Sequence, residues 1–340
     1  MIKFARRVRP DILHDNVNVT REIEDFLTSI SFVDNISAEP DTVSIAMSDR
    51  EKKWRSAWRP KKGSVIKCAL VVSSGWDGIK PTNRFIGTFE IDKFSISGTP
   101  KISTIEGLSI PQSSTLNRSQ KTKAWEKTGF RKIAEDVAKA NGMTLYFSAM
   151  DNPYYDRVDQ EGETDLSFLM RLCSDAGLTL KVANKKLIIM DEAKLEEAPE
   201  KLLIKESDKA IKSYDGDDSL TSLYRSCSVK WTDPKTKKVK RYTFTPKHPP
   251  ATNRVLYVNE EINSESAAKK LAMSKLRDAN KNGMTFSIRF AGFLTAFAGE
   301  TVRLEDFDAF DGKYIITSVS ATVSKGSETT LSLRRVLEGY

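Results

Sequence analysis

The two ends of the chain carry the same order of β-strand signals, and this repeat limits the possible folds more than any other feature. Residues 61–107 contain a glycine, a strand, an aromatic-x-Gly turn, a long strand, another glycine and a third strand. Residues 297–335 repeat this order with loops of different length. β-Branched runs separated by glycine and proline turns are typical of antiparallel sheets. The 340 residues have room for about two domains, so we expect one β-domain near each end. A chance match of generic strand patterns is the alternative.

The expected strands fall into the same two regions. In the first region we expect strands over 29–33, 42–47, 64–73, 84–94 and 99–108, with a short helix over 49–58. In the last region we expect strands over 202–205, 219–231, 284–290, 300–304, 313–322 and 328–336, a hairpin over 229–245 with its turn near 233–235, and a helix over 264–280.

The middle of the chain has a helical period instead. Apolar residues recur from Phe130 to Val137 at helical spacing, and a strand over 143–148 follows. A second helix has Thr164 as a plausible N-cap and ends at Gly177. A hairpin over 178–190 completes a tandem α/β module. The acidic stretch 191–199 ends in proline and is a linker candidate.

Cysteine and histidine are scarce, which excludes several kinds of chemistry. The three cysteines lie far apart without metal-ligand spacing, and there are only two histidines. We therefore expect no disulfide framework, no metal site and no histidine-based catalysis. The sequence has no apolar run long enough to cross a membrane and no secretion signal, so we expect a soluble protein without membrane insertion.

No group of residues indicates an enzyme or a bound cofactor. The sequence lacks GxSxG, GxGxxG and phosphate-loop patterns. The acidic run 215–218 lacks the glutamate that a calcium loop requires, so we read it as a surface turn. Carboxylate pairs such as Glu161 with Glu163 and Glu305 with Asp306 are not shown to face a cleft. Cys173 lies on an apolar helix stripe and is expected to be buried. We expect no catalytic, cofactor-binding or metal-binding residue.

Two basic segments carry the positive charge. Residues 50–62 and 230–247 each contain seven basic side chains and one acidic side chain, while the whole chain has a net charge of +8. The rest of the chain is therefore slightly acidic. Such segments bind nucleic acid, dock an acidic protein or are simply solvated, and the sequence leaves these three readings open. The residues that we expect to bind a partner are Trp54, Trp58, Lys235, Lys237, Lys238, Lys240 and Arg241.

The segment 159–177, DQEGETDLSFLMRLCSDAG, resembles a hallmark of the phage late control gene D family. The family comprises tail baseplate hub proteins, with relatives in contractile bacteriocins and in the hub part of type VI secretion spikes. The matching positions are Gln160, Glu163, Asp165, Phe168, Leu169, Arg171, Leu172 and Gly177, whereas Thr164 replaces the family's serine. The helix over 265–276, the stretch 310–316 and the closing 331–335 also resemble the family, so the resemblance covers nearly the whole chain.

The resemblance implies a β-rich α+β fold with two tube-like antiparallel β-barrels that bracket a small α/β module. We place the first barrel at 1–112, the module at 113–198 and the second barrel, with the basic hairpin and a helix insertion, at 199–340. It also implies a homotrimer, because three chains with two barrels each give six similar domains around a channel.

The implied function is a structural baseplate hub in the virion or tail-like particle, made in the bacterial cytoplasm. The hub would join the sixfold tail tube to the threefold central spike and contact other baseplate subunits. We expect the hairpin around Lys235 to Arg241 to contact a neighbouring baseplate or tube subunit. The alternatives are a cell-wall-degrading tail enzyme and a nucleic-acid-binding protein that uses the basic segments. The sequence shows no helix-turn-helix, so specific nucleic-acid binding is not expected.

Overall fold

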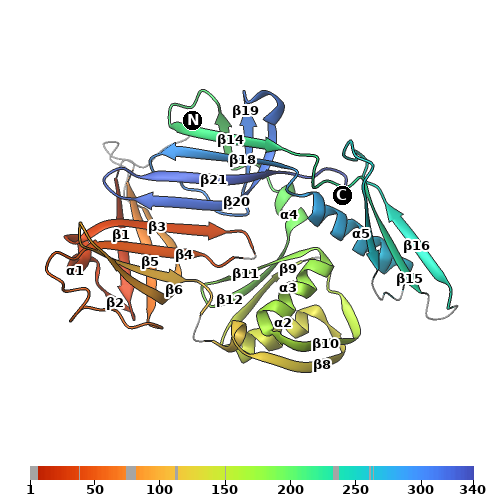
Figure 1. Ribbon diagram of the computed structural model, residues 1–340, viewed down its shortest axis with the longest axis horizontal. Helices are drawn as coiled ribbons and strands as arrows, with labels where there is room; N and C mark the ends of the chain where they lie inside the picture. Colours follow the sequence, from red (N-terminus) through yellow and green to blue (C-terminus); the bar gives the residue numbers. More distant parts are fainter. Residues whose placement is uncertain are drawn as a thin grey trace.

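The structure is a computed structural model that describes residues 7–37, 39–73, 82–111, 114–149, 151–232, 237–259, 262 and 264–340. Figure 1 shows a large sheet along the top of the molecule, an α/β module beneath its middle and a small sheet with a helix at one end. The chain is β-rich with several helices, which confirms the expected α+β class.

The elements follow the three regions of the sequence. The first region contains β1 (Arg7–His14), β2 (Val17–Asn18), α1 (Thr20–Glu24), β3 (Leu27–Asn35), β4 (Thr42–Ser48), β5 (Val65–Ser73), β6 (Thr82–Ser97) and β7 (Ile102–Leu108). The middle contains η1 (Thr115–Asn117), β8 (Gln120–Gly129), α2 (Phe130–Ala140), β9 (Thr144–Ser148), β10 (Tyr154–Thr164), α3 (Asp165–Ala176), β11 (Leu178–Ala183), β12 (Lys186–Asp191) and α4 (Glu192–Glu197). The last region contains β13 (Leu202–Lys205), β14 (Ile211–Asp218), β15 (Ser226–Thr232), β16 (Val239–Phe244), β17 (Val255–Asn259), α5 (Glu265–Asn280), β18 (Met284–Ala291), β19 (Thr301–Glu305), η2 (Asp308–Phe310), β20 (Gly312–Val323) and β21 (Glu328–Arg335).

The two β-regions form one continuous sheet of 13 strands instead of two closed barrels. Its main path runs β14-β18-β21-β20-β3-β4-β7-β6-β5-β1-β2, and β19 pairs with both β20 and β13. The two regions meet where β20 pairs with β3. Among the described strands no sheet closes on itself, so the closed form of the expected barrels is not seen.

The repeat predicted from the sequence is confirmed by the strand order. The path β3-β4-β7-β6-β5 of the first copy corresponds to β14-β18-β21-β20-β19 of the second copy. Both copies also carry β-bulges at corresponding places. The first pair of bulges falls between Leu27 and Ser29 and between Ile211 and Ser213, and the second pair falls between Ile91 and Lys93 and between Ile316 and Ser318.

Hydrogen bonds beside the second pair of bulges match as well. The Gly63 amide donates to the Ile91 carbonyl at 2.8 Å, and the Gly299 amide donates to the Ile316 carbonyl at 2.8 Å. Both glycines have positive φ, at 84° and 90°, a conformation that favours glycine. Corresponding bulges and hydrogen bonds are more specific than a shared strand pattern, which removes the chance match as an explanation.

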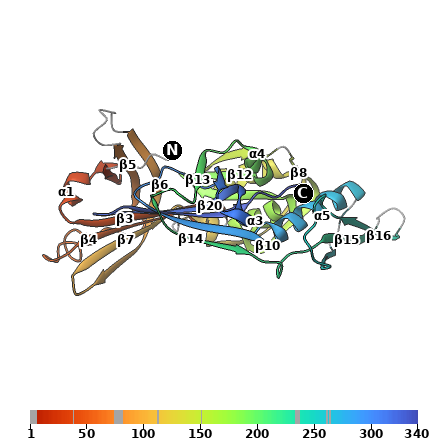
Figure 2. The same ribbon diagram turned by 90° about the horizontal axis from the view of Figure 1, so that it is seen from above.

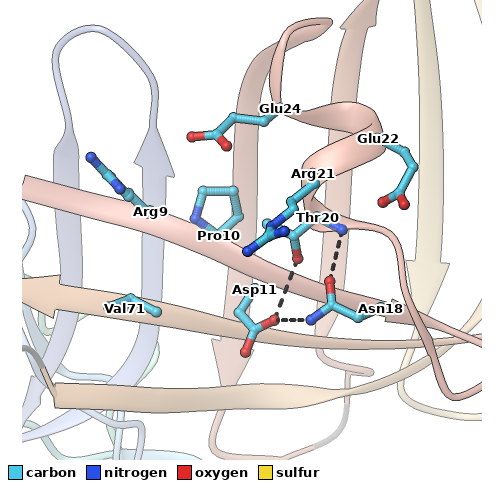
Figure 3. A pocket seen from close by; sticks show the side chains of 9 residues that line it. All are labelled: Arg9, Pro10, Asp11, Asn18, Thr20, Arg21, Glu22, Glu24 and Val71. Atoms are coloured by element: carbon cyan, nitrogen blue, oxygen red, sulfur yellow. Dashed lines mark hydrogen bonds between the residues drawn. The ribbon is translucent and has the colours of Figure 1, made fainter.

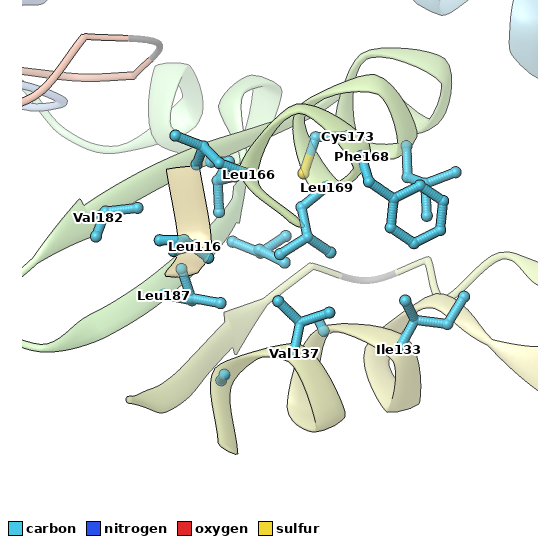
Figure 4. Packing of buried hydrophobic residues seen from close by; sticks show 14 of the residues in the cluster. Leu116, Ile133, Val137, Leu166, Phe168, Leu169, Cys173, Val182 and Leu187 are labelled. Carbon is cyan, nitrogen blue, oxygen red and sulfur yellow. The ribbon is translucent and has the colours of Figure 1, made fainter. Parts of the chain in front are cut away.

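The α/β module has its own core between two helices and two small sheets. The sheet order β11-β12-β9 is accompanied by the β8–β10 hairpin. Figure 4 shows Ile133 and Val137 of α2 facing Phe168, Leu169 and Cys173 of α3 across this core. Thr164 caps α3 by accepting a hydrogen bond from the Ser167 amide, and Gly177 ends the helix with φ of 69°, as the sequence predicts.

The basic hairpin belongs to a separate small sheet and not to the second copy of the repeat. The sheet order is β16-β15-β17, and its apolar face packs on α5. Both views of the chain place this unit at the end of the molecule opposite β1 to β7 (Figure 1, Figure 2). Helix α5 also contacts the module through Lys275, whose Nζ lies 2.8 Å from Asp175 Oδ1.

The predicted linker over 191–199 is instead a helix tied to the C-terminal strands. Helix α4 places Glu192 and Glu196 against Arg334 of β21, with N–O distances of 3.0 and 2.6 Å. Arg277 of α5 also pairs with Glu196. Arg334 and Glu196 are 1% and 3% exposed. Removal of one member of such a buried ion group leaves an uncompensated charge, so this segment fixes the module to the large sheet.

Candidate docking surfaces and a hydroxyl-rich sheet face

The first basic segment, 50–62, forms a series of turns between β4 and β5 instead of the expected helix. Asp49 organises these turns: its carboxylate accepts hydrogen bonds from the Trp54 amide at 3.1 Å, Arg55 Nε at 2.8 Å and Ser103 Oγ at 3.0 Å. Burial alone raises the pKa of Asp49, but these hydrogen bonds outweigh burial and hold it below its usual value. Lys52 has φ of 60°, which is incompatible with a continuous helix.

The two tryptophans of this segment have different environments. Trp54 is only 6% exposed and belongs to the core of the first copy, whereas Trp58 is 44% exposed. Their rings meet edge to face at 5.4 Å, and Lys53 Nζ lies 5.2 Å from the Trp58 ring centre. Of the two predicted partner-binding tryptophans, only Trp58 therefore presents its ring at the surface.

The second basic segment is divided between two faces of the small sheet. Because side chains alternate along a strand, Lys240 and Arg241 of β16 lie on opposite faces. Lys240 pairs with Trp231 in the register of β15 and β16, and Arg241 pairs with Lys230. Lys237 and Lys238 are exposed and precede β16, while Lys235 lies outside the described residues.

The outer face of this small sheet holds two like charges opposite each other. Lys230 and Arg241 are cross-strand neighbours, and both are exposed. Like charges in directly opposed positions destabilise a strand pair. Tyr257 of the adjacent strand is 72% exposed beside them. An acidic partner would relieve this repulsion and cover the ring.

A third surface, which the sequence reading missed, is the hydroxyl-rich face of the large sheet. Strands β4 and β7 alternate between buried and half-buried residues, so one face packs on the core and the other does not. The uncovered face carries small hydroxyl side chains over eight adjacent strands: Ser213, Thr285, Ser287, Thr330, Ser332, Ser318, Ser320, Thr322, Ser31, Thr42, Ser44, Thr104 and Ser95.

Strand register places many of these hydroxyls side by side. Ser31 lies opposite both Thr322 and Ser44, which crosses the junction between the two copies. Ser332 likewise lies opposite Ser287 and Ser318. The alternation of polar and apolar residues, as in Thr42–Ser48, is the sequence feature that indicates such a face. The extent of the hydroxyl-rich face depends on the order of the strands in the sheet, which the sequence alone does not show.

The polar residues of the segment 159–177 have structural partners. Asp165 is 3% exposed at its side chain and accepts hydrogen bonds from Gln160 Nε2 at 3.1 Å, Asn141 Nδ2 at 3.0 Å and Lys121 Nζ. Burial acts to raise the pKa of Asp165, but these three donors lower it below its usual value. Arg171 donates to the Asp159 carbonyl at 2.9 Å. The motif therefore joins α3 to β8, β10 and the end of α2.

Lys181 connects the module to the large sheet. Its Nζ pairs with Asp34 and lies 3.1 Å from Asp41 Oδ1 and 2.7 Å from the Asn35 carbonyl. Asp34 also accepts a hydrogen bond from the Ala298 amide at 2.9 Å, which brings in the second copy. Burial raises the pKa of Asp41 to about 6, although Lys181 opposes this shift.

The remaining candidates do not form a reaction centre. Burial raises the pKa of Cys68 to about 12 and raises that of Cys173 further, so neither thiol is activated. The acidic run 215–218 lies in strand β14, not in the expected surface turn. Among the residues that the structure describes, no group of three or more His, Cys, Asp or Glu is arranged to hold a metal ion. No helix within these residues is long and apolar enough to span a bilayer.

Several polar side chains that line a surface hollow near the N-terminus form hydrogen bonds with one another. It has a volume of about 570 Å³ and lies between β1 and α1. Figure 3 shows Asp11, Asn18 and Thr20 joined by hydrogen bonds. Asn18 Nδ2 donates to Asp11 Oδ1 at 3.0 Å, and the Thr20 amide donates to Asn18 Oδ1 at 2.9 Å. These contacts stabilise the turn between β2 and α1.

Comparison with known proteins identifies relatives of the chain. The profile described as phage tail baseplate hub (GPD) matches residues 109–327. A probable baseplate hub protein of Escherichia phage 186 is 26% identical over 270 residues, which cover 78% of this chain and 66% of the relative. A probable baseplate hub protein of Escherichia phage P2 is 27% identical over 180 residues, which cover 53% of this chain and 44% of the relative. The chain thus spans about two thirds or less of these relatives.

Solved structures share the fold over nearly the whole chain. A tail protein from Neisseria meningitidis MC58 superposes with a TM-score of 0.73 at 13% identity and covers 96% of both chains. This shared fold, together with the profile match, places the chain in the class of phage tail proteins. The chain belongs to the phage tail baseplate hub family. This confirms the expected structural function and the location in a virion or tail-like particle.

Proposed function

We propose that this chain is a structural hub without enzymatic activity. Three copies form a homotrimer that joins the sixfold tail tube to the threefold central spike and encloses the tail channel. The single observation that supports this best is the duplicated sheet unit, with its corresponding bulges, in every chain. Three chains with two such units each present six similar surfaces, which lets a threefold object match a sixfold one.

The separate hydrophobic clusters support the proposed divisions 1–112, 113–198 and 199–340. One cluster lies within the module, one centres on the first copy and one lies in the second copy. A fourth cluster joins α5 to the small sheet. The first cluster of the sheet also includes Phe293, Ala321 and Val323 from the second copy, so the two copies support each other through shared core residues.

The hydroxyl-rich face is our candidate for the channel lining. DNA binding is driven mainly by lysine and arginine neutralising phosphates, and small uncharged hydroxyls avoid this attraction. Lys93 on the same face is neutralised within the chain, because its Nζ lies 3.0 Å from Glu106 Oε1. A polar, weakly attractive lining suits a channel through which a polymer passes.

Trimer formation is the first test of this function. We expect mass photometry of the chain co-expressed with the spike protein of its particle to give a hub mass three times 38.2 kDa. The chain alone at the same concentration is the reference. A hub that stays monomeric in the presence of the spike would overturn the proposal.

A further inference from the structure

Within the part of the chain that the structure describes, the repeat leaves one strand edge unpaired in each copy. Within the chain, β3 of the first copy pairs with the outer edge of β20 in the second copy. The strands that correspond to these two are β14 and β6. Among the described residues, β14 pairs only with β18, and the final part of β6 pairs only with β7. The edge of β14 that corresponds to the paired edge of β3 is therefore exposed, and so is the edge of β6 that corresponds to the paired edge of β20.

The junction inside the chain defines a register. Residues 318–323 of β20 run antiparallel to residues 30–35 of β3, with Ser320 opposite Val33 and Thr322 opposite Ser31. The Ile36 amide extends this ladder with a hydrogen bond of 2.9 Å to the Thr317 carbonyl. The paired part of β20 begins directly after the bulge at Ser318.

The corresponding bulges transfer this register to the unpaired strands. Lys93 follows its bulge as Ser318 does, and Ser213 follows its bulge as Ser29 does. We apply the register of the β20–β3 junction to the corresponding strands β6 and β14. Residues 93–97 of β6 then run antiparallel to residues 215–219. Ser95 then lies opposite Asp217, and Ser97 lies opposite Asp215.

We propose that β14 of one copy of this chain pairs antiparallel with the end of β6 in a second copy, in this register. The inference rests on the proposed trimer and names the surfaces that form it. Three such contacts, alternating with the three β20–β3 contacts inside the chains, close the sheets into one ring of six repeats. Edge strands are normally protected against pairing, whereas here the exposed edge is the means of assembly.

The exposed side chains at the two edges fit one another. Ile96 is 54% exposed on β6, and in the transferred register it lies opposite Gly216 of β14. The corresponding pair inside the chain is Ala321 with Phe32. Each pair thus combines one small and one large residue.

Charge supports the same pairing. Strand β14 presents Asp215, Asp217 and Asp218, all exposed. In the transferred register Lys93 is the diagonal neighbour of Asp217, a distance that long side chains reach across a sheet. An acidic edge on each copy opposes pairing of β14 with another β14 and favours β6.

Disulfide trapping tests the register. We expect the variant Ser95→Cys/Asp217→Cys, oxidised in the assembled hub, to give covalent dimers and trimers on a non-reducing gel, because directly opposed strand residues have the spacing that a disulfide needs. The native cysteines are all buried. The matched control is Ser95→Cys/Ser213→Cys, whose second thiol is displaced by four residues, or about 13 Å. We expect at least about tenfold less cross-linking in this control.

A second in-register pair, Ser97→Cys/Asp215→Cys, covers the case in which the first variant misfolds, and circular dichroism checks both. Trimers by mass photometry that cross-link in neither in-register variant would overturn this interface and leave the trimeric hub standing. Equal cross-linking in the displaced control would also overturn it. Absence of trimers in the unmodified chain would instead defeat the proposed function itself.

Discussion

At the scale of single residues, the junction around Lys181 determines how the module is held. Its ammonium group meets Asp34 and Asp41 of the first copy, and Asp34 also receives the amide of Ala298 from the second copy. Ser109 adds a second link, since its hydroxyl donates to the Val182 carbonyl at 2.8 Å and accepts from the Asp41 amide at 2.9 Å. A few buried polar contacts therefore connect three parts of the chain.

Asp41 makes this junction sensitive to pH. Its pKa is raised from 3.8 to about 6 in the folded chain, so the folded state binds the proton more tightly than the unfolded state. The resulting stabilisation is complete below pH 4 and is lost as the pH rises through 6. The shift corresponds to about 3 kcal/mol in the free energy of unfolding.

We expect Asp41→Asn to remove this dependence. Between pH 4 and pH 7 the variant should gain about 2 kcal/mol relative to the unmodified chain, because its amide does not titrate. Urea unfolding at both pH values measures the difference, and Asp156→Asn, at an exposed site, is the control. A difference between variant and unmodified chain that does not change with pH would refute this role of Asp41.

Sequence reasoning found some residue roles and missed others for a physical reason. Thr164 and Gly177 were predictable because a helix cap depends on neighbouring residues. The role of Asp165 was not predictable, because its partners Lys121 and Asn141 are distant in sequence. Trp54 and Trp58 were expected within one short helix, but the hydrogen bonds of Asp49 form turns, and only Trp54 is buried.

At the scale of elements, the basic hairpin is our candidate docking element, and the core of the large sheet does not require it. It lies on the small sheet with α5, at the end of the molecule away from the first basic segment (Figure 1). We expect Lys237→Glu/Lys238→Glu/Lys240→Glu to lower incorporation of the hub into baseplates by about tenfold, because charge reversal repels an acidic neighbour.

The matched control reverses three charges of the other basic segment, as Lys52→Glu/Lys61→Glu/Lys62→Glu. Incorporation is measured from the amount of hub in purified particles, and circular dichroism confirms folding. Normal incorporation of the hairpin variant would remove the hairpin as a docking element, and equal loss in the control would show a general charge effect.

Several elements depend on partners that local sequence does not reveal. Strands β1, β8 and β10 were not predicted, because their polar residues hide the strand period and their pairing partners are separate segments. Strand β17 was not predicted either, and it pairs with β15 from a separate segment. Helix α4 was expected to be a linker on account of its charge. Its glutamates are buried only because Arg334 and Arg277 approach from distant elements.

At the scale of the whole molecule, the repeat was predictable but its closure was not. Two similar β-units can be read from strand signals alone, and the structure confirms their common order. The sequence led us to expect two closed barrels. The β20–β3 pairing joins both units in one sheet, and among the described residues β14 and the end of β6 each keep one edge unpaired. We therefore expect the ring to close at the level of the assembly.

Closure of the ring gives the hydroxyl-rich face its proposed place along the channel. We expect Ser44→Lys/Ser287→Lys/Ser320→Lys to leave assembly intact but to reduce DNA delivery by a DNA-carrying particle by about tenfold or more, because ammonium groups in the lining bind phosphates. The same charges at exposed Ser56, Ser222 and Asn253 are the control. Electron microscopy measures assembly and a transfer assay measures delivery. Normal delivery in assembled particles would place this face outside the channel, whereas a specific loss that high salt relieves would place it along the path of the DNA.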